Sequence, residues 1–511
     1  MKKKDNILPQ PSSTSRAFVK GLSLNIVTNL LLYIGHLIIA RCLLRDDYAT
    51  FIVVGSLVSL AALFADLGIT GLFVRKFAEA EALVAQGKKD TRGELLGTIL
   101  VVRIFLAIAT SSVVILIAPL LGYSLETQHL ILIMLVTLFI SSRLIVVRSA
   151  GEAFLRAANK YHVVAFLAAI DALVFASVLY YYSGKSLNLE SVVWIYSFCH
   201  LPGFLLLFGI IYRDVKSIDF RLHFRFSLIK SMIRESIPLI LSTAFLTIHN
   251  QADTLLLDKL SSPKEVSAYG AGLRILSAII FLPFVFSAVI GPSVTQATVN
   301  KTFDKIRTTL DRSLRLLLTG ALFVAILLSV SSELVMNILF GAGKYSDAAP
   351  LVMVFGWSFI PICFAAFITD IAVAEGKYWI TVLFTSIIMI VAIGCDLLLI
   401  PHYGGLGSAI AKCISVCIGS IALLTTSNTL QVVDRKKIGV LFLKLGAAAI
   451  CLLSFIQILN YISVEPILIV ISVILAFLIF VIFILKIISF QEIQDTFSDF
   501  FNKKRNTGVS V

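Results

Sequence analysis

The chain has 511 residues, of which 58% are hydrophobic and 14% are charged, and its formal net charge is +13. A water-soluble domain is nearer half apolar and a quarter charged, so this composition excludes a soluble enzyme or binding module. Apolar runs of about 18 residues or more recur along the chain, without the polar–apolar alternation of membrane β-strands. The sequence therefore predicts an all-α integral membrane protein, in which helices satisfy their own backbone groups in lipid.

Fourteen membrane-spanning helices are predicted when the sequence is cut at charged and turn-forming breaks. In chain order they cover roughly residues 20–44, 49–74, 95–121, 129–149, 161–182, 190–212, 231–257, 265–292, 314–338, 348–373, 378–400, 405–428, 439–460 and 464–487. Polar tails, 1–19 and 488–511, flank them. The first tail lacks the short apolar core and cleavage site of a secretory signal.

Lys and Arg are unevenly distributed over the two sides of the membrane that these spans define. The side that holds the N-terminus carries 33 of the 43 Lys and Arg residues, and the opposite side carries 6. Because cytoplasmic loops hold the excess of positive charge, we expect both termini in the cytoplasm. We interpret the net charge as a topology signal and not as a nucleic-acid-binding surface.

The loops and cysteines offer little chemistry for an enzyme. The predicted outer loops have about fifteen residues at most, which is too short for an extramembrane active-site domain. The seven cysteines lie mostly inside apolar runs without metal-ligand spacing, so we interpret them as small core residues. We therefore expect no enzymatic activity, no catalytic residues, no metal site and no disulfide framework.

Two short segments indicate an internal repeat. "AANKY", residues 157–161, and "AEGKY", residues 374–378, both join two apolar runs and lie 217 positions apart. Tyr48 and Tyr269, near the starts of spans 2 and 8, are related by a similar shift. The repeat predicts two six-helix bundles of equal orientation, a plan that transporters use. The predicted bundles are residues 20–213 and 231–430, joined by a cytoplasmic linker, 214–230, and followed by two extra helices in 431–487.

Four phrases along the chain resemble one transporter family. They are "DLGITGLFVRKFAEA" (66–80), "YGAGLRI" (269–275), "FGAGKYSDAAPL" (340–351) and "IPHYGGLGSAIA" (400–411). Their order and spacing are similar to those of the O-antigen and polysaccharide transporter family. That family belongs to the MOP superfamily, with the multidrug and toxin extrusion (MATE) transporters and the lipid II flippases. The resemblance covers roughly residues 20–490.

The resemblance implies a fold and a function. The fold is two six-helix bundles in a V, with spans 1, 2, 7 and 8 lining a central cavity. The function is translocation of undecaprenyl-diphosphate-linked oligosaccharide repeat units of O-antigen, capsule or exopolysaccharide. By alternating access, they would pass from the cytoplasmic to the periplasmic leaflet of a bacterial inner membrane. A polysaccharide polymerase and a chain-length regulator are the implied protein partners.

Polar residues inside the predicted spans are the candidate substrate-binding groups, because charges there are costly and usually face protein or water. Arg274 in span 8 has a guanidinium that suits phosphate oxygens, or it forms a buried pair with Asp253. His36 and Arg41 lie on span 1, where Arg41 could instead extend to the outer surface. The run His249, Asn250, Gln251 and Asp253 on span 7 suits sugar hydroxyls.

Other charged residues in the spans leave two roles open. Asp66 in span 2 is the candidate for coupling to H⁺ or Na⁺, or it pairs locally; no other cofactor is expected. Asp396 and Lys412 face each other across one outer turn and are predicted to form a structural pair. Asp171 in span 5 and Asp370 in span 10 are predicted to be buried and not to bind substrate. The basic residues nearer the cytoplasm, Arg103, Arg143 and Arg148, are interpreted as extending to lipid phosphates or the surface.

Three alternative functions remain at this point. A MATE-type antiporter of small organic cations would favour carboxylates in its cavity, and its family typically has twelve spans. A lipid II flippase handles a chemically similar diphosphate lipid. A membrane enzyme would need paired catalytic groups on a common loop, which this sequence lacks.

Overall fold

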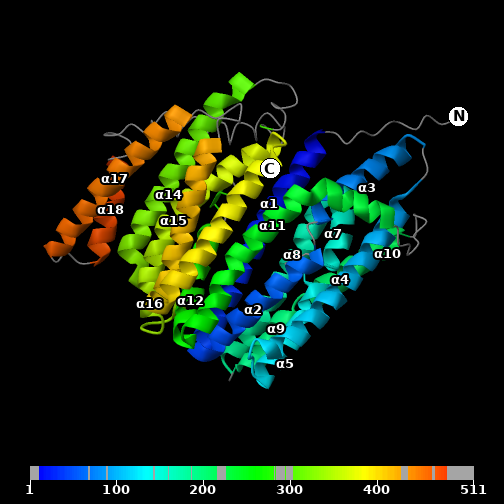
Figure 1. Cartoon of the computed structure of the whole chain (residues 1–511), viewed down its shortest axis with the longest axis horizontal. Coiled ribbons are helices and arrows are strands. Elements are labelled where there is room, and N and C mark those ends of the chain that lie inside the picture. Colours follow the sequence, from blue (N-terminus) through cyan, green and yellow to red (C-terminus); the bar gives the residue numbers. More distant parts are fainter. Residues whose placement is uncertain are drawn as a thin grey trace. The chain divides into compact units, whose positions relative to one another are not determined.

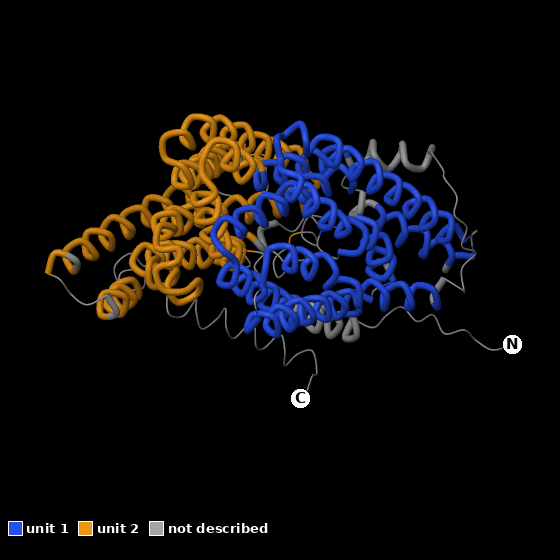
Figure 2. Tube along the Cα trace, turned by 90° about the horizontal axis from the view of Figure 1, so that it is seen from below, with its two compact units in different colours: residues 1–251 blue, residues 252–511 orange. Residues whose placement is uncertain are grey.

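A computed structural model describes most of the chain. The described residues are 11–479, apart from 67–68, 88–89, 142–143, 216–225, 284–293, 295–302, 427–434, 463–465 and the single positions 145, 159, 186 and 281. Within them all regular structure is helical, as the sequence predicts. Packing divides the chain into two units, residues 1–251 and 252–511, and each is described by itself (Figure 2).

Unit 1 contains eleven helices in the described part of the chain, and Figure 1 labels all of them except the short α6. They are α1 Pro11–Cys42, α2 Arg45–Asp66, α3 Ile69–Ala85, α4 Arg92–Leu120, α5 Leu125–Leu135, α6 Thr137–Ile140, α7 Arg148–Ala157, α8 Tyr161–Ser183, α9 Leu189–Phe198, α10 Leu201–Val215 and most of α11, Phe226–Leu260. Helices α3, α4, α7, α8 and α10 enclose an apolar core. In it the rings of Phe77 and Phe154 meet edge to face, 4.9 Å between centroids.

Unit 2 begins with the last residues of α11 and continues to the C-terminal helices. Its described helices are α12 Pro263–Ile279, α14 Phe303–Phe340, the short 3₁₀ helix η1 Ser346–Ala348, α15 Ala349–Ala374, α16 Tyr378–Thr426, α17 Arg435–Tyr461 and α18 Pro466–Ile479. The rings of Phe364 and Phe442 join α15 to α17, and those of Phe323 and Phe477 join α14 to α18. The two extra C-terminal helices therefore pack on the core of unit 2.

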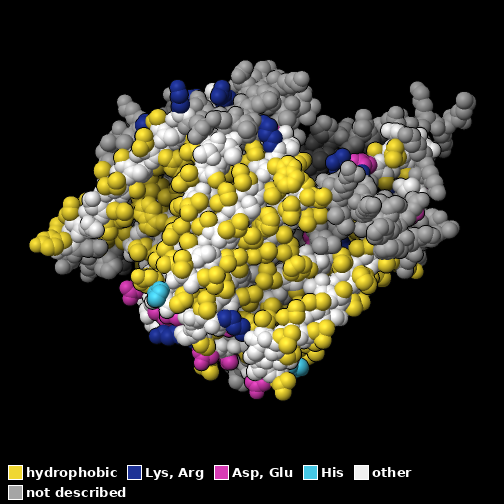
Figure 3. Space-filling model, viewed as in Figure 1, with side chains coloured by type: hydrophobic (Ala, Val, Ile, Leu, Met, Phe, Trp, Pro, Cys, Tyr) yellow, Lys and Arg dark blue, Asp and Glu magenta, His cyan; other side chains and the backbone are white. Residues whose placement is uncertain are grey.

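Nine of the described helical segments are long and apolar enough to cross a membrane, and two further apolar helices are shorter. Large hydrophobic side chains are exposed on their outer faces, for example Phe105 and Leu116 on α4. Hydrophobic side chains cover the long helices in Figure 3, whereas charged side chains gather towards helix ends. Such faces suit lipid. The count of fourteen spans and the limits of the two predicted bundles stay predictions, and the linker 214–230 lies partly outside the described residues.

The predicted outer turn between spans 11 and 12 is a sharp break inside α16. Gly404 has φ +53° and ψ −132°, whereas the residues on either side are helical. A Cβ at Gly404 would lie 2.7 Å from the Glu265 carboxylate, which accepts a 2.8 Å hydrogen bond from the Gly405 N–H. Only glycine combines this backbone conformation with such a close approach. The break that the sequence predicts after residue 400 is thus confirmed.

The two repeated joints are built with the same backbone hydrogen bonds. In unit 1, the Lys160 N–H donates to the carbonyl of Leu155, 2.8 Å away. In unit 2, the Lys377 N–H donates to the carbonyl of Ala372, also at 2.8 Å, and every partner is shifted by 217. A hydrogen bond of this kind, from the N–H of one residue to the carbonyl five residues earlier, is typical of a helix C-terminus. Gly376 has the positive φ of +76° that this turn requires. The sequence similarity therefore reflects one turn used in both units.

The orientation of the spans can be tested with reporter fusions. Because positive charge marks the cytoplasmic side, fusions after residues 124, 186, 260, 344, 404 and 462 should report the outer side. Fusions after residues 85, 220, 305 and 435 should report the cytoplasm. An alkaline phosphatase reporter, active only outside, and a green fluorescent reporter, fluorescent only inside, measure this. A single exchanged position would contradict the fourteen-span topology.

Candidate functional site

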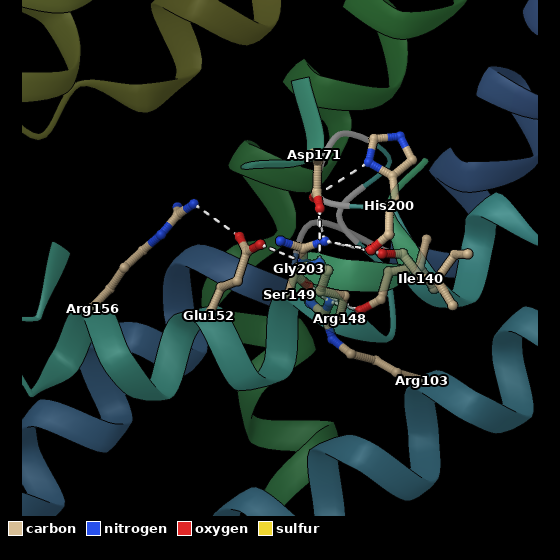
Figure 4. Close-up of polar contacts among 10 residues, drawn as sticks. Arg103, Ile140, Arg148, Ser149, Glu152, Arg156, Asp171, His200 and Gly203 are labelled. Carbon is tan, nitrogen blue, oxygen red and sulfur yellow. Dashed lines mark hydrogen bonds and ion pairs between the residues drawn. The ribbon is translucent and has the colours of Figure 1, made fainter. Parts of the chain in front are cut away.

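Arg148 is the centre of a buried charge cluster in unit 1. It begins α7 and is fully buried. Its Nε lies 3.0 Å from Oε1 of Glu152, one turn along the helix, and its Nη1 lies 2.5 Å from Oδ2 of Asp171 on α8. Figure 4 shows Glu152 between Arg148 and the more exposed Arg156, whose Nη2 is 3.3 Å away. One arginine thus neutralises two buried carboxylates, with a second arginine at the edge.

The same cluster fixes the interruption between α9 and α10. The carbonyl of His200, at this interruption, accepts a hydrogen bond from Arg148 Nη1, and His200 Nδ1 lies 3.4 Å from Asp171 Oδ2. The Gly203 N–H donates to Asp171 Oδ1 over 3.0 Å. A Cβ at Gly203 would come within 2.2 Å of that oxygen, so glycine is required there. Asp171 therefore ties α8 to the start of α10 and to α7.

A second arginine, Arg103 on α4, holds Asp66 at the end of α2. Its Nη2 lies 2.8 Å from Asp66 Oδ1, and its Nη1 donates to the Val146 carbonyl and the Ser149 hydroxyl. Only 2% of the Arg103 side chain is exposed. The interpretation of Arg103 and Arg148 as residues that reach the surface is therefore wrong, because both are buried and paired. For Asp66, the pair with Arg103 supports the local role that the sequence left open; Arg143 lies outside the described residues.

A polar cavity of about 190 Å³ adjoins the Arg148 cluster. Helices α1, α7 and α8 line it, and its polar wall includes Asn25, Asn29, Glu152, Arg156 and Asp171. Asn25 Nδ2 donates to the hydroxyl of Tyr161, the last residue of the repeated joint, over 2.6 Å. Amide, hydroxyl and charged groups of this kind hold water or the polar part of a ligand.

Sequence reasoning missed this cluster as a unit. The sequence predicted that Asp171 is buried and does not bind substrate, and it did not single out Glu152 or His200. One signal was present: acidic residues inside or beside apolar runs require partners, and Arg148 lies four residues before Glu152, on the same face of a helix. The partners come from α7, α8 and the α9–α10 interruption, so their meeting follows from the packing of helices far apart in the chain.

Unit 2 holds a separate polar cluster around Asp253. Its Oδ2 lies 2.7 Å from Lys412 Nζ and accepts a 2.6 Å hydrogen bond from the Tyr269 hydroxyl. Its Oδ1 accepts from the N–H and the hydroxyl of Thr254. The predicted pair of Lys412 with Asp396 is therefore wrong, because Lys412 pairs with Asp253. The alternative pair of Arg274 with Asp253, which the sequence left open, does not form. Arg274 is half-buried on α12 and forms no hydrogen bond or ion pair with any described residue.

The other candidate residues occupy different surroundings. His36 on α1 is buried among aromatic rings, with Phe175 5.6 Å away between centroids, whereas Arg41 is exposed at the end of α1. On α11, His249 and Asp253 are buried one turn apart, Asn250 is exposed and Gln251 is half-buried. The polar run on α11 thus spreads around the helix instead of lining one surface. That these residues bind substrate stays a prediction.

Comparison with known proteins agrees with this architecture. Residues 19–298 match a family model described as "Polysaccharide biosynthesis protein", and residues 238–398 match the MatE model. A comparison with curated proteins finds no match.

Solved structures similar to this chain include the following three. The lipid II flippase MurJ, in an inward closed conformation, has a TM-score of 0.70 and 16% identity, over 90% of this chain and 98% of that one. An inward-facing MATE transporter of the MOP superfamily has a TM-score of 0.65 and 14% identity, over 82% and 99%. A Vibrio cholerae MATE transporter has 0.53 and 15%, over 83% and 99%. At such identities the likeness shows the fold, which is that of MurJ and the MATE transporters.

Proposed function

Because the chain belongs to the polysaccharide biosynthesis protein family, whose model matches more than half of it, we propose that this membrane transporter is a flippase for lipid-linked oligosaccharides. Its substrate would be an undecaprenyl-diphosphate-linked repeat unit of O-antigen, capsule or exopolysaccharide. It would move that unit from the cytoplasmic to the periplasmic leaflet of an inner membrane, with both termini in the cytoplasm. The family match is the observation that carries the proposal.

The chemistry of the substrate indicates what the protein must supply. A diphosphate is anionic, so its passage requires cationic and hydrogen-bonding groups among apolar helices, while the lipid tail stays in the bilayer. Arg274 is the basic side chain best suited to this role, because no described residue neutralises it and it is not fully buried. A polymerase and a chain-length regulator would receive the product.

A second candidate function is export of small organic cations, which the MatE match over residues 238–398 favours. A cation site needs carboxylates that are available to the substrate. Asp66, Asp171 and Asp253 each already pair with a basic side chain. This pairing supports an anionic substrate. Translocation of lipid II would use the same diphosphate chemistry and differ only in the sugar.

Complementation separates these functions. The full chain is expressed in three bacterial strains: one lacking its polysaccharide flippase, one depleted of its lipid II flippase and one lacking its multidrug exporters. We expect restored surface polysaccharide in the first strain, measured by antibody labelling, and no effect in the other two. Rescue of growth in the second strain, or drug resistance in the third without polysaccharide display, would contradict the proposal. A matched strain carrying the empty vector is the control.

The role of Asp66 is tested by Asp66→Asn. Since Asp66 pairs with Arg103, we expect the variant to lose thermal stability and to keep the same dependence of transport on an ion gradient. Gradient dependence is measured as polysaccharide display with and without an ionophore, at matched membrane levels. Display that no longer responds to the ionophore would return Asp66 to the coupling mechanism.

A further inference from the structure

Two buried carboxyl groups and one buried ammonium group lie close together in unit 2. Asp253 and Asp396 are 2% and 1% exposed, and Lys412 is 6% exposed. Both Asp396 and Lys412 belong to α16, on either side of the break at Gly404, whereas Asp253 belongs to α11. Asp396 lies near Asp253, Lys412 and Ser408. The cluster would carry one net negative charge in the interior if both acids were ionised.

Asp253 already has every partner that an ionised carboxylate needs. Its two oxygens receive the Lys412 ammonium, the Tyr269 hydroxyl, and the N–H and hydroxyl of Thr254. Charge-assisted bonds of this kind stabilise the anion strongly. The ammonium of Lys412 is therefore committed to Asp253, and Asp253 is the ionised member of the pair.

Asp396 has the opposite surroundings. Its Oδ1 is buried and has no hydrogen-bond partner among the described residues, and the group nearest to it that is not titratable is the Ser408 hydroxyl. The titratable groups that face it are Asp253 from α11, Tyr269 from α12, and Cys395 and Lys412 from α16. Burying an ionised carboxylate without a partner costs several kcal/mol, and a second carboxylate nearby adds repulsion. A neutral, protonated carboxyl avoids both costs.

We propose that Asp396 is a proton-binding site, which holds one proton while the cluster is closed and releases it to water when the cluster is hydrated. On release, the cluster changes from zero net charge, with Asp253 ionised and Lys412 charged, to one net negative charge. Lys412 can then be shared between the two carboxylates. Rebinding of one proton from water restores the closed arrangement. Coupling of this exchange to transport rests on the proposed function.

The experiment is infrared difference spectroscopy on the full chain in phosphatidylethanolamine–phosphatidylglycerol vesicles, with pH steps and deuterium exchange to identify protonated carboxyl groups. The probe is the proton itself, so the measurement needs no substrate. We expect the wild type to show, near neutral pH, a protonated-carboxyl band that Asp396→Asn removes. Asp66→Asn, an acid paired with arginine, is the matched control and should retain the band. Size-exclusion profiles confirm that each variant is folded.

Two further variants test the assignment through charge. Asp253→Asn should remove the band, because Lys412 is then left to Asp396, which ionises. Lys412→Met should strengthen it, because two acids then lack a cation. A wild-type spectrum without a band, or a band that survives in Asp396→Asn, overturns the proposal. These outcomes do not depend on polysaccharide display, so failure of the flippase function would be recognised separately.

A display assay then tests coupling. Polysaccharide display by Asp396→Asn should be lost, or should become insensitive to a proton ionophore, whereas display by Asp258→Asn, at an acid near the end of α11 that pairs with Lys259, should retain wild-type sensitivity. Wild-type display and ionophore sensitivity in Asp396→Asn would overturn the coupling role.

Discussion

Arg148→Met should lower the free energy of unfolding by about 3–5 kcal/mol, the usual cost of removing one partner from a buried ion pair. Methionine keeps much of the aliphatic stem but leaves Asp171 without its charge partner and Glu152 with only the more exposed Arg156. It also removes donors to the carbonyls of Ile140 and His200. Thermal unfolding of the purified protein in detergent measures the loss.

Two variants make this result specific to the buried cluster. Arg75→Met removes an exposed arginine that pairs with Glu79 one turn along α3, and it should change stability little. Arg148→Met combined with Asp171→Asn should recover part of the lost stability, because one unpaired buried charge is removed. If Arg148→Met unfolds at the temperature of Arg75→Met, the cluster does not hold unit 1 together.

Arg274→Ala should abolish most polysaccharide display at matched membrane levels. Charge-assisted hydrogen bonds contribute about 1.5–3 kcal/mol each, so loss of one such contact weakens diphosphate binding roughly 10- to 150-fold. Arg274→Lys keeps the charge but loses the planar pair of donors, so it should retain part of the activity. Antibody labelling of surface polysaccharide in a strain without its own flippase measures both variants.

The pair between Asp253 and Lys412 removes one alternative explanation for the effects of the Arg274 variants. Asp253 is paired with Lys412, so loss of activity in Arg274→Ala does not arise from a stranded Asp253. Lys259→Ala, a cation at the exposed end of α11, is the control and should display polysaccharide normally. Full display in Arg274→Ala would remove Arg274 from substrate binding. Equal loss in Arg274→Ala and Arg274→Lys would show that the position requires the arginine shape and not its charge alone.

The helices and the positions at which they end or turn could be predicted from the sequence alone. Uninterrupted apolar runs of about 18 residues or more are typical of membrane-spanning helices. Glycine with a positive φ marks where such helices end or turn, as at Gly376 and Gly404. Both are local consequences of composition and backbone sterics. The repeated joint could be recognised from two similar five-residue segments, because the conformation of this turn depends mainly on the residues within it.

Which charged residues form pairs depends on how the helices pack. The sequence predicted a pair of Lys412 with Asp396 and left open a pair of Arg274 with Asp253, because each pair is close along adjacent spans. The packing of α11, α12 and α16 instead brings Lys412 and Tyr269 to Asp253 and leaves Oδ1 of Asp396 without a hydrogen-bond partner in the described part of the chain. In unit 1 it likewise gathers Arg148, Asp171 and His200 from separate helices. The rotation of each helix about its axis and its position along the membrane normal determine which charged side chains meet. The hydropathy of the sequence specifies neither.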